Sequence, residues 1–301
     1  MDDLEVGAVS EAPAPRRVRL HPLVRIAIVL GALAVVWGLS SLVLDGAPAP
    51  SPTSTVSRLA DALLRGAAGV ALIVLACRML DRRRLAALGF GWSRSDRVAL
   101  GAGVGLWLGL AAVGTAVGVV SGWFGVQLVV PTAALLRHAV VHAILVLCSE
   151  ALPEELAFRG YVYTNLADLF PRWLAVVGQA VLFTAWPLAL FGVLRLAEVQ
   201  PNWSFNLERV VLFLTMGVAL ALVRLWTDSL WGSVGLHWAF QMTIQLLSID
   251  RLPVMRVPAA DVGNASIVLW FFGIVLAGVI AGIGSARSRG RRAGRNETAS
   301  A

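Results

Sequence analysis

Eight blocks of about twenty mostly apolar residues follow one another along this 301-residue chain, and they restrict its fold more than any other feature. A helix needs about 20 apolar residues to cross the hydrocarbon core of a bilayer. Blocks of this length predict an all-α polytopic membrane protein, a bundle of about eight transmembrane helices. The expected spans are residues 23–44, 59–79, 98–122, 132–150, 173–194, 208–225, 228–248 and 265–284.

The composition agrees with this class, because 58% of the residues are hydrophobic and only 14% are charged. Soluble globular chains are roughly a quarter charged. We expect a cytoplasmic N-terminal segment (1–22), the transmembrane bundle (23–284) and a basic cytoplasmic tail (285–301). The tail is low in hydrophobic residues and is therefore expected to lack regular structure.

The arginines predict the orientation of the chain. All 25 basic residues are arginines, and with the N-terminus inside, 17 of them fall on the inner side and five on the outer side. The remaining three, Arg65, Arg137 and Arg159, lie within spans. Because inner loops are enriched in positive charge, both termini are expected in the cytoplasm of a multi-pass protein of the cell membrane.

The same distribution argues against a nucleic-acid-binding protein, although the net charge is +7. The arginines flank apolar segments and do not alternate with aromatic residues on a polar surface. The two cysteines, Cys77 and Cys148, lie in separate apolar segments, which excludes a disulfide framework and a cysteine-based zinc site.

A group of ionisable residues closes the fourth span, where each such group is costly at membrane depth. If the helix continues, Glu155 and Arg159 stand at i and i+4 and form an ion pair. Glu154 is rotated by about 100° from Glu155 and has no partner of its own. A carboxylate of this kind can accept a proton from water. The alternative is structural: the pair holds the bundle together, and Glu154 reaches the cytoplasmic interface.

A second group lies in the seventh span, where His237 and Gln241 share one helix face at i and i+4. An imidazole and an amide placed together can polarise a carbonyl or stabilise an oxyanion. The alternative is a histidine hydrogen-bonded between helices. A third pair, His138 and His142, has a spacing that suits a metal. It lies about 18 Å along the helix from Glu154, so these residues cannot share one ion without a fold-back.

Taken together, Glu154-Glu155-x-x-x-Arg159-Gly160 and the later His237 resemble the CPBP family of intramembrane proteases. This family includes the type II CAAX prenyl endopeptidases and bacterial bacteriocin-processing and self-immunity proteins. The stretch Asp228-Ser-Leu-Trp-Gly-Ser-Val-Gly-Leu-His237 is similar to the family's third motif, and the resemblance covers roughly residues 130–250.

Two positions depart from the family pattern. The second motif, Phe-x-x-x-His, corresponds to Phe183-Thr-Ala-Trp-Pro187, which places a proline where the histidine should stand. In the third motif, Gln241 replaces Asn, and the extra methylene moves the amide by about 1.5 Å. With the second histidine absent, only His237, Glu154 and Glu155 are left as metal ligands, whereas a structural zinc usually has four protein ligands and a catalytic zinc three. We therefore expect no metal or other cofactor.

The resemblance implies an intramembrane endopeptidase that cleaves a membrane-associated peptide at a site open to the cytoplasm. Its candidate catalytic residues are Glu154, Glu155, Arg159, His237 and Gln241: Glu154 activates water, and His237 and Gln241 stabilise the oxyanion. The alternative is a catalytically silent relative that binds or shields a membrane partner, as an immunity or regulatory protein does. A transporter with a proton or ion relay is a third possibility, but the sequence contains no internal repeat that would support it.

Overall fold

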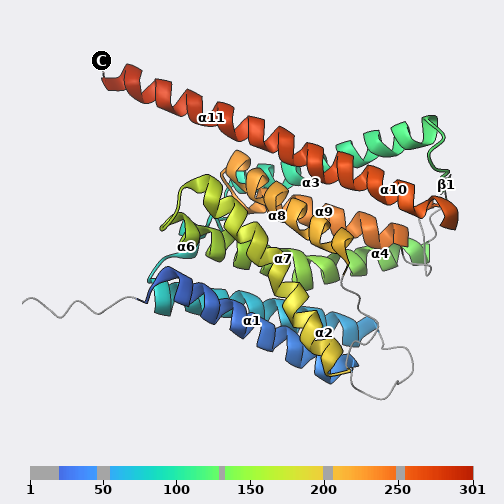
Figure 1. The fold of residues 1–301 in the computed structure, drawn as a ribbon, viewed down its shortest axis with the longest axis horizontal. Helices are drawn as coiled ribbons and strands as arrows, with labels where there is room; N and C mark the ends of the chain where they lie inside the picture. The colour runs from blue at the N-terminus through green and yellow to red at the C-terminus, as the bar shows by residue number, and fades with distance from the viewer. Residues whose placement is uncertain (1–19, 46–54, 129–132, 199–205, 249–254, 301) are drawn as a thin grey trace, which may run out of the picture.

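The computed structural model describes residues 20–45, 55–128, 133–198, 206–248 and 255–300 as a bundle of long helices (Figure 1). Six of the long helices are uninterrupted, apart from a π-helical turn at the end of one of them. They are α1 (Pro22–Asp45), α7 (Arg172–Leu196), α8 (Leu207–Thr227), α9 (Leu230–Ser248), α2 (Thr55–Ala76) with a π-helical turn at Cys77–Asp81, and α3 (Arg94–Val120). Short 3-10 helices occur at Leu85–Leu88 and Ala259–Asp261.

The remaining two long helices contain π-helical stretches. The first runs from residue 133 to 167 as α4 (Ala133–Val146), a π-helical turn (Leu147–Ala151), α5 (Leu152–Glu155), a second π-helical stretch (Leu156–Val162) and α6 (Tyr163–Ala167). The last runs from residue 262 to 300 as α10 (Val262–Leu269), a π-helical stretch (Trp270–Leu276) and α11 (Ala277–Ser300). The bundle of about eight helices is confirmed.

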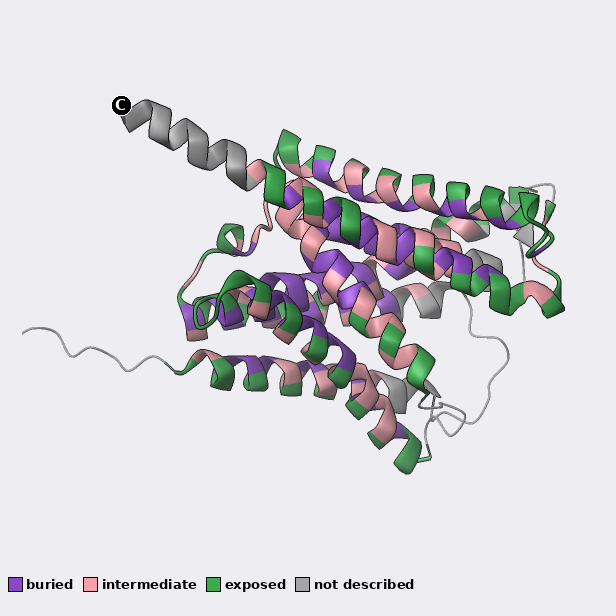
Figure 2. Cartoon of the chain, turned by 45° about the horizontal axis from the view of Figure 1, so that its top comes forward, coloured by how far each residue is buried: buried purple, intermediate pink, exposed green. Residues whose placement is uncertain are grey.

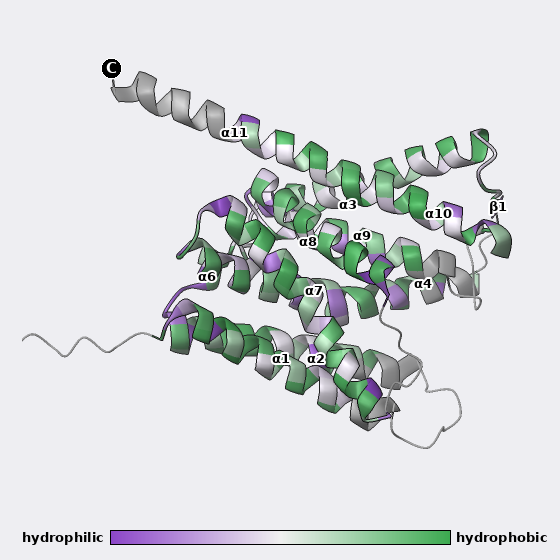
Figure 3. Cartoon of the chain, in the orientation of Figure 1, coloured by the Kyte–Doolittle hydropathy of each residue, from purple (hydrophilic) through white to green (hydrophobic). Residues whose placement is uncertain are grey.

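Six helical segments among the described residues are long and apolar enough to cross a membrane. They are Pro22–Ser40, Ala62–Asp81, Arg94–Val120, Arg172–Leu196, Leu207–Thr227 and Ala259–Ser288. Their outer surfaces are largely hydrophobic (Figure 3), with large exposed side chains such as Leu64, Val181 and Ile267. Apolar side chains on this scale need lipid around them. The chain is a multi-pass membrane protein.

The buried residues gather along the inner faces of the helices (Figure 2). The interior includes a buried ion pair between Arg25 in α1 and Asp81, with Nη1 and Oδ1 2.7 Å apart, and the same guanidinium reaches Asn165 in α6. This contact joins three segments that are distant in the sequence, and it fixes α1 and α2 against the helix that carries the candidate catalytic carboxylates.

Helices α3 and α9 pack closely through glycines. A Cβ on Gly103 would collide with the Gly232 carbonyl oxygen, and one on Gly235 would collide with the Leu100 carbonyl oxygen. Small residues allow helix backbones in a membrane to approach in this way. The contact positions α9, and therefore His237.

Gly103→Ala is therefore expected to lower the free energy of unfolding by about 1–3 kcal/mol, because the added methyl group must push α3 and α9 apart. Unfolding in mixed micelles, followed by tryptophan fluorescence, measures this change. The control is Gly105→Ala in the same helix, since a Cβ there meets nothing within 4 Å. Equal stability of the two variants would contradict the close approach.

Two expectations need correction. The fourth span does not end near residue 150, because the helix continues to Ala167 with its charged side chains inside the bundle. The tail is not without regular structure, because α11 continues to Ser300. Arginine and alanine are good helix formers, so the basic composition does not stop the helix. A two-residue antiparallel ladder, Gln127–Leu128 with Met255–Arg256, is the one pairing of strands in the described ranges.

Candidate functional site

The centre of the site is a buried cluster of three side chains from two helices. Arg159 Nη1 lies 2.9 Å from Glu155 Oε1, which confirms the predicted i, i+4 pair. His237 Nδ1 in α9 lies 2.8 Å from the same Glu155 oxygen. Glu155 and Arg159 are fully buried, and His237 is almost fully buried. One carboxylate therefore contacts two basic side chains at a place that water does not reach. Removing either partner would leave a charge without compensation.

Phe183 in α7 covers the other side of this cluster. Its ring centre lies 3.9 Å from Arg159 Cζ, and it also contacts the His237 ring edge to face. In the described part of the chain, Arg159 Nε and Nη2 have no hydrogen-bond partner. The guanidinium instead makes a cation–π contact with the face of the Phe183 ring. The phenylalanine of the second motif thus holds Arg159 in place.

Glu154 points to a different place from Glu155. It lines a cavity of about 420 Å³ between α1, α2, α5, α7, α8 and α9, and it is half-buried. Its carboxylate makes no hydrogen bond with any other described residue. The lining also includes His237, Gln241 and Pro187. Glu154 thus lies in a cavity between the helices, and the structural alternative, in which it reaches the cytoplasmic interface, stays a prediction.

The π-helical stretches on either side of α5 account for this arrangement. They end at Ala151 and begin again at Leu156, so Glu154 and Glu155 lie in one short α-helical turn between two widened turns. Pro153 in that turn supplies no amide hydrogen. Within that α-helical turn successive side chains are about 100° apart, so one carboxylate lines the cavity and the other lies in the buried cluster.

Gln241 has a partner that the sequence did not indicate. Its Nε2 donates to Glu150 Oε2 at 2.6 Å, and both residues line the cavity. Because an amide nitrogen carries two hydrogens, one remains available to a bound group. Arg65 in α2 lines the same cavity. Both Glu150 and Arg65 could have been suspected as ionisable residues at membrane depth, and Glu150 stands one helical turn before Glu154.

Pro187 occupies the cavity wall at the position where the second motif has its histidine. Helix α7 continues through the proline without a break from Arg172 to Leu196. The neighbouring Trp186 donates its indole N–H to the Leu30 carbonyl oxygen in α1 at 3.0 Å, which helps hold this part of α7. A side chain at position 187 would face the same space as Glu154 and His237.

The histidine pair of α4 does not contribute to this cavity as far as the structure describes it. His142 is absent from the lining residues, and the side chain of His138 lies outside the description. No group of three or more His, Cys, Asp or Glu side chains in the described ranges has an arrangement that could hold a metal ion. The expectation of no metal stays a prediction.

The cavity lies nearer one end of the bundle than the other. Phe191, Leu212 and Ile244 line it within five residues of the end of α7, the start of α8 and the end of α9. In the orientation expected from the arginines this is the outer side of the membrane, and an opening of the site to the cytoplasm stays a prediction.

The fold and site define a helical membrane protein with a largely apolar cavity, into which a few polar side chains project, beside a buried Glu–His–Arg cluster. A family model described as Type II CAAX prenyl endopeptidase Rce1-like matches residues 136–243, the region that contains every residue of that cluster. This match covers about a third of the chain and agrees with the resemblance to the CPBP family, which rests on residues of the same region. No curated protein and no solved structure matches it.

Proposed function

We propose that this protein is an intramembrane endopeptidase in which Glu154 activates the hydrolytic water. The observation that carries the proposal is the position of Glu154, whose carboxylate faces a cavity shared with His237 and Gln241 and is not held by any hydrogen bond within the described residues. A carboxylate in this position can take a proton from water.

The proposed reaction uses the two sides of the cavity. Water attacks the peptide carbonyl carbon while its proton passes to Glu154, and the carbonyl oxygen becomes an oxyanion. Glu154 then gives the proton to the amide nitrogen as the carbon–nitrogen bond breaks. The products are a new carboxylate and a new amine.

His237 and Gln241 would stabilise the oxyanion. His237 Nδ1 is hydrogen-bonded to Glu155, and in the imidazolium form Nε2–H is a second donor, which can serve a group in the cavity that His237 lines. The second Gln241 N–H is the other donor. Glu155 and Arg159 act through His237, since they are too deeply buried to touch a substrate.

The proposed substrate is a membrane-associated peptide or protein, because the cavity lies among transmembrane helices. We propose the cell membrane as its location, with both termini in the cytoplasm, and no metal ion in the reaction.

The second candidate function is that of a catalytically silent relative that binds or shields a membrane partner. Two observations favour it: Pro187 supplies no acid or base to the cavity, and Gln241 is engaged by Glu150. Absence of a positioned acid–base residue typically lowers a rate by about 10²–10⁴.

A survey of new peptide termini in host membranes separates the two functions. Wild type, Glu154→Gln and the exposed-site control Glu208→Gln are compared at matched expression. We expect termini that appear with wild type and Glu208→Gln and disappear with Glu154→Gln, and their sequences would identify the substrate. Identical surveys for wild type and Glu154→Gln would contradict the peptidase and favour the silent relative.

A further inference from the structure

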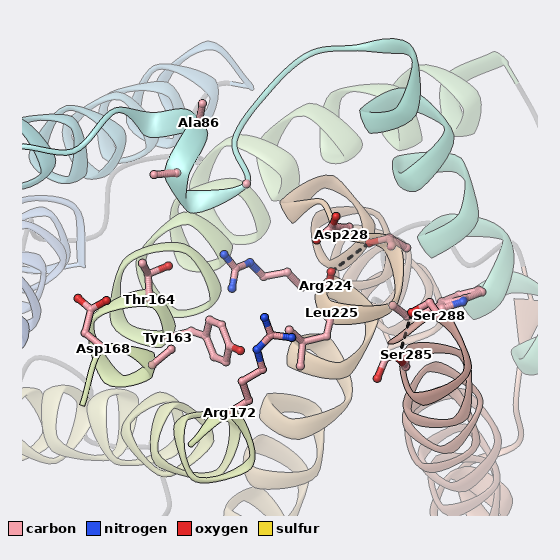
Figure 4. A pocket seen from close by; sticks show the side chains of 15 residues that line it. Ala86, Tyr163, Thr164, Asp168, Arg172, Arg224, Leu225, Asp228, Ser285 and Ser288 are labelled. Carbon is pink, nitrogen blue, oxygen red and sulfur yellow. Dashed lines mark hydrogen bonds between the residues drawn. The ribbon is translucent and has the colours of Figure 1, made fainter. Parts of the chain in front are cut away.

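A second cavity, of about 520 Å³, lies at the arginine-rich end of the bundle and is separate from the proposed catalytic cavity. Its walls come from α6, the start of α7, the end of α8 and α11, together with the 3-10 helix before α3 (Figure 4). None of its lining residues lines the cavity that contains Glu154. The proposed peptidase reaction therefore gives it no role.

Three hydrogen-bond donors converge in this cavity. Arg172 and Arg224 both extend into the space beside the Tyr163 ring (Figure 4). The Arg224 guanidinium stacks on that ring with Cζ 4.7 Å from its centre, and its Nη2 donates to the Leu88 carbonyl oxygen at 3.0 Å. These contacts fix its orientation and leave its remaining N–H groups available.

Two of these donors have no partner among the described residues. Arg172 makes neither a hydrogen bond nor an ion pair there, although it is exposed. The Tyr163 hydroxyl also has no hydrogen bond, and this side chain is only 6% exposed. The hydroxyl itself is not enclosed by protein, so it can donate a hydrogen bond to a group in the cavity.

The charges favour an anion as that acceptor. Asp168 and Asp228 also line the cavity, but Asp168 is already paired with Arg83, whose Nη2 lies 2.5 Å from its Oδ2. The lining thus contains two arginines and two aspartates, and Arg83, which lies outside the lining, offsets the charge of Asp168. Planar guanidinium groups match the oxygen geometry of phosphate.

We propose that this cavity binds a phosphate group, that of an anionic phospholipid headgroup. The location supports the lipid as its source, because the cavity lies where several membrane-spanning helices begin or end. Arg172 and Arg224 bind the phosphate oxygens, and the Tyr163 hydroxyl donates the third hydrogen bond.

The test is titration of the delipidated full-length protein in detergent with dioleoylphosphatidylglycerol, followed by native mass spectrometry. Arg172→Gln is expected to raise the Kd about tenfold, as the loss of one charged hydrogen bond does. Tyr163→Phe, which keeps the ring beneath Arg224, should also weaken binding. Arg94→Gln is the matched control, because Arg94 is exposed at the same end of the bundle and does not line the cavity.

Two further arms identify the source of the phosphate. Dioleoylphosphatidylcholine, which is neutral overall, should bind more weakly than the anionic lipid. Inorganic phosphate that displaces the lipid with the same dependence on Arg172 would support the phosphate chemistry and overturn the lipid as its source. Equal lipid binding by Arg172→Gln and Arg94→Gln would overturn the site itself.

Discussion

Arg159→Met is expected to lower the free energy of unfolding by about 3–5 kcal/mol, because within the described residues it leaves the buried Glu155 carboxylate with His237 as its one basic contact. Arg159 and Glu155 are both fully buried, so water cannot replace the lost partner. Unfolding in mixed micelles, followed by tryptophan fluorescence, measures the change.

The double variant Glu155→Gln, Arg159→Met distinguishes a lost charge pair from lost packing. Replacing both partners of a buried pair is often less harmful than removing one. The double variant should therefore be more stable than the sum of the single changes predicts, and Arg94→Met at an exposed position should be near neutral. Additive losses in the double variant would show that the ion pair does not stabilise the bundle.

Pro187→His combined with Gln241→Asn is expected to raise the rate of peptide cleavage at least about a hundredfold. Position 187 faces the cavity that Glu154 and His237 line, so the new imidazole can act as an acid or base there. The shorter Asn no longer reaches Glu150 in the way Gln241 does. The rate is measured with the purified variants in lipid vesicles, on a peptide identified by the survey of termini.

Pro187→Ala with the same Gln241→Asn change is the control for this gain. It restores the helix N–H that proline lacks but adds no imidazole. A gain as large with alanine as with histidine would mean that relief of the proline, and not acid–base chemistry, had changed the rate.

The sequence predicted contacts within one helix better than contacts between helices. Helical spacing placed Glu155 and Arg159 together, and the structure confirms this pair. The bonds from His237 to Glu155 and from Gln241 to Glu150 join residues that are 82 and 91 positions apart. Spacing assigns each side chain to a face of its own helix, but which faces meet depends on packing of the whole bundle.

The end of the fourth span was misjudged for a related physical reason. The hydropathy pattern predicts the end of an apolar segment at Glu154, Glu155 and Arg159, because charged groups are costly in lipid. In the structure they face the bundle interior, where a cavity and a buried pair accommodate them, and the helix continues to Ala167. A hydropathy pattern cannot distinguish a charge at the membrane surface from one that a neighbouring helix covers.

The most direct measurement of the role proposed for Glu154 is the ratio of cleavage rates of wild type and Glu154→Gln. Both proteins are purified, placed in vesicles of the same composition and given the same peptide, with Glu208→Gln as the control. We predict a ratio of at least about 100, with Glu208→Gln close to wild type. Equal rates for wild type and Glu154→Gln would contradict a Glu154-activated water.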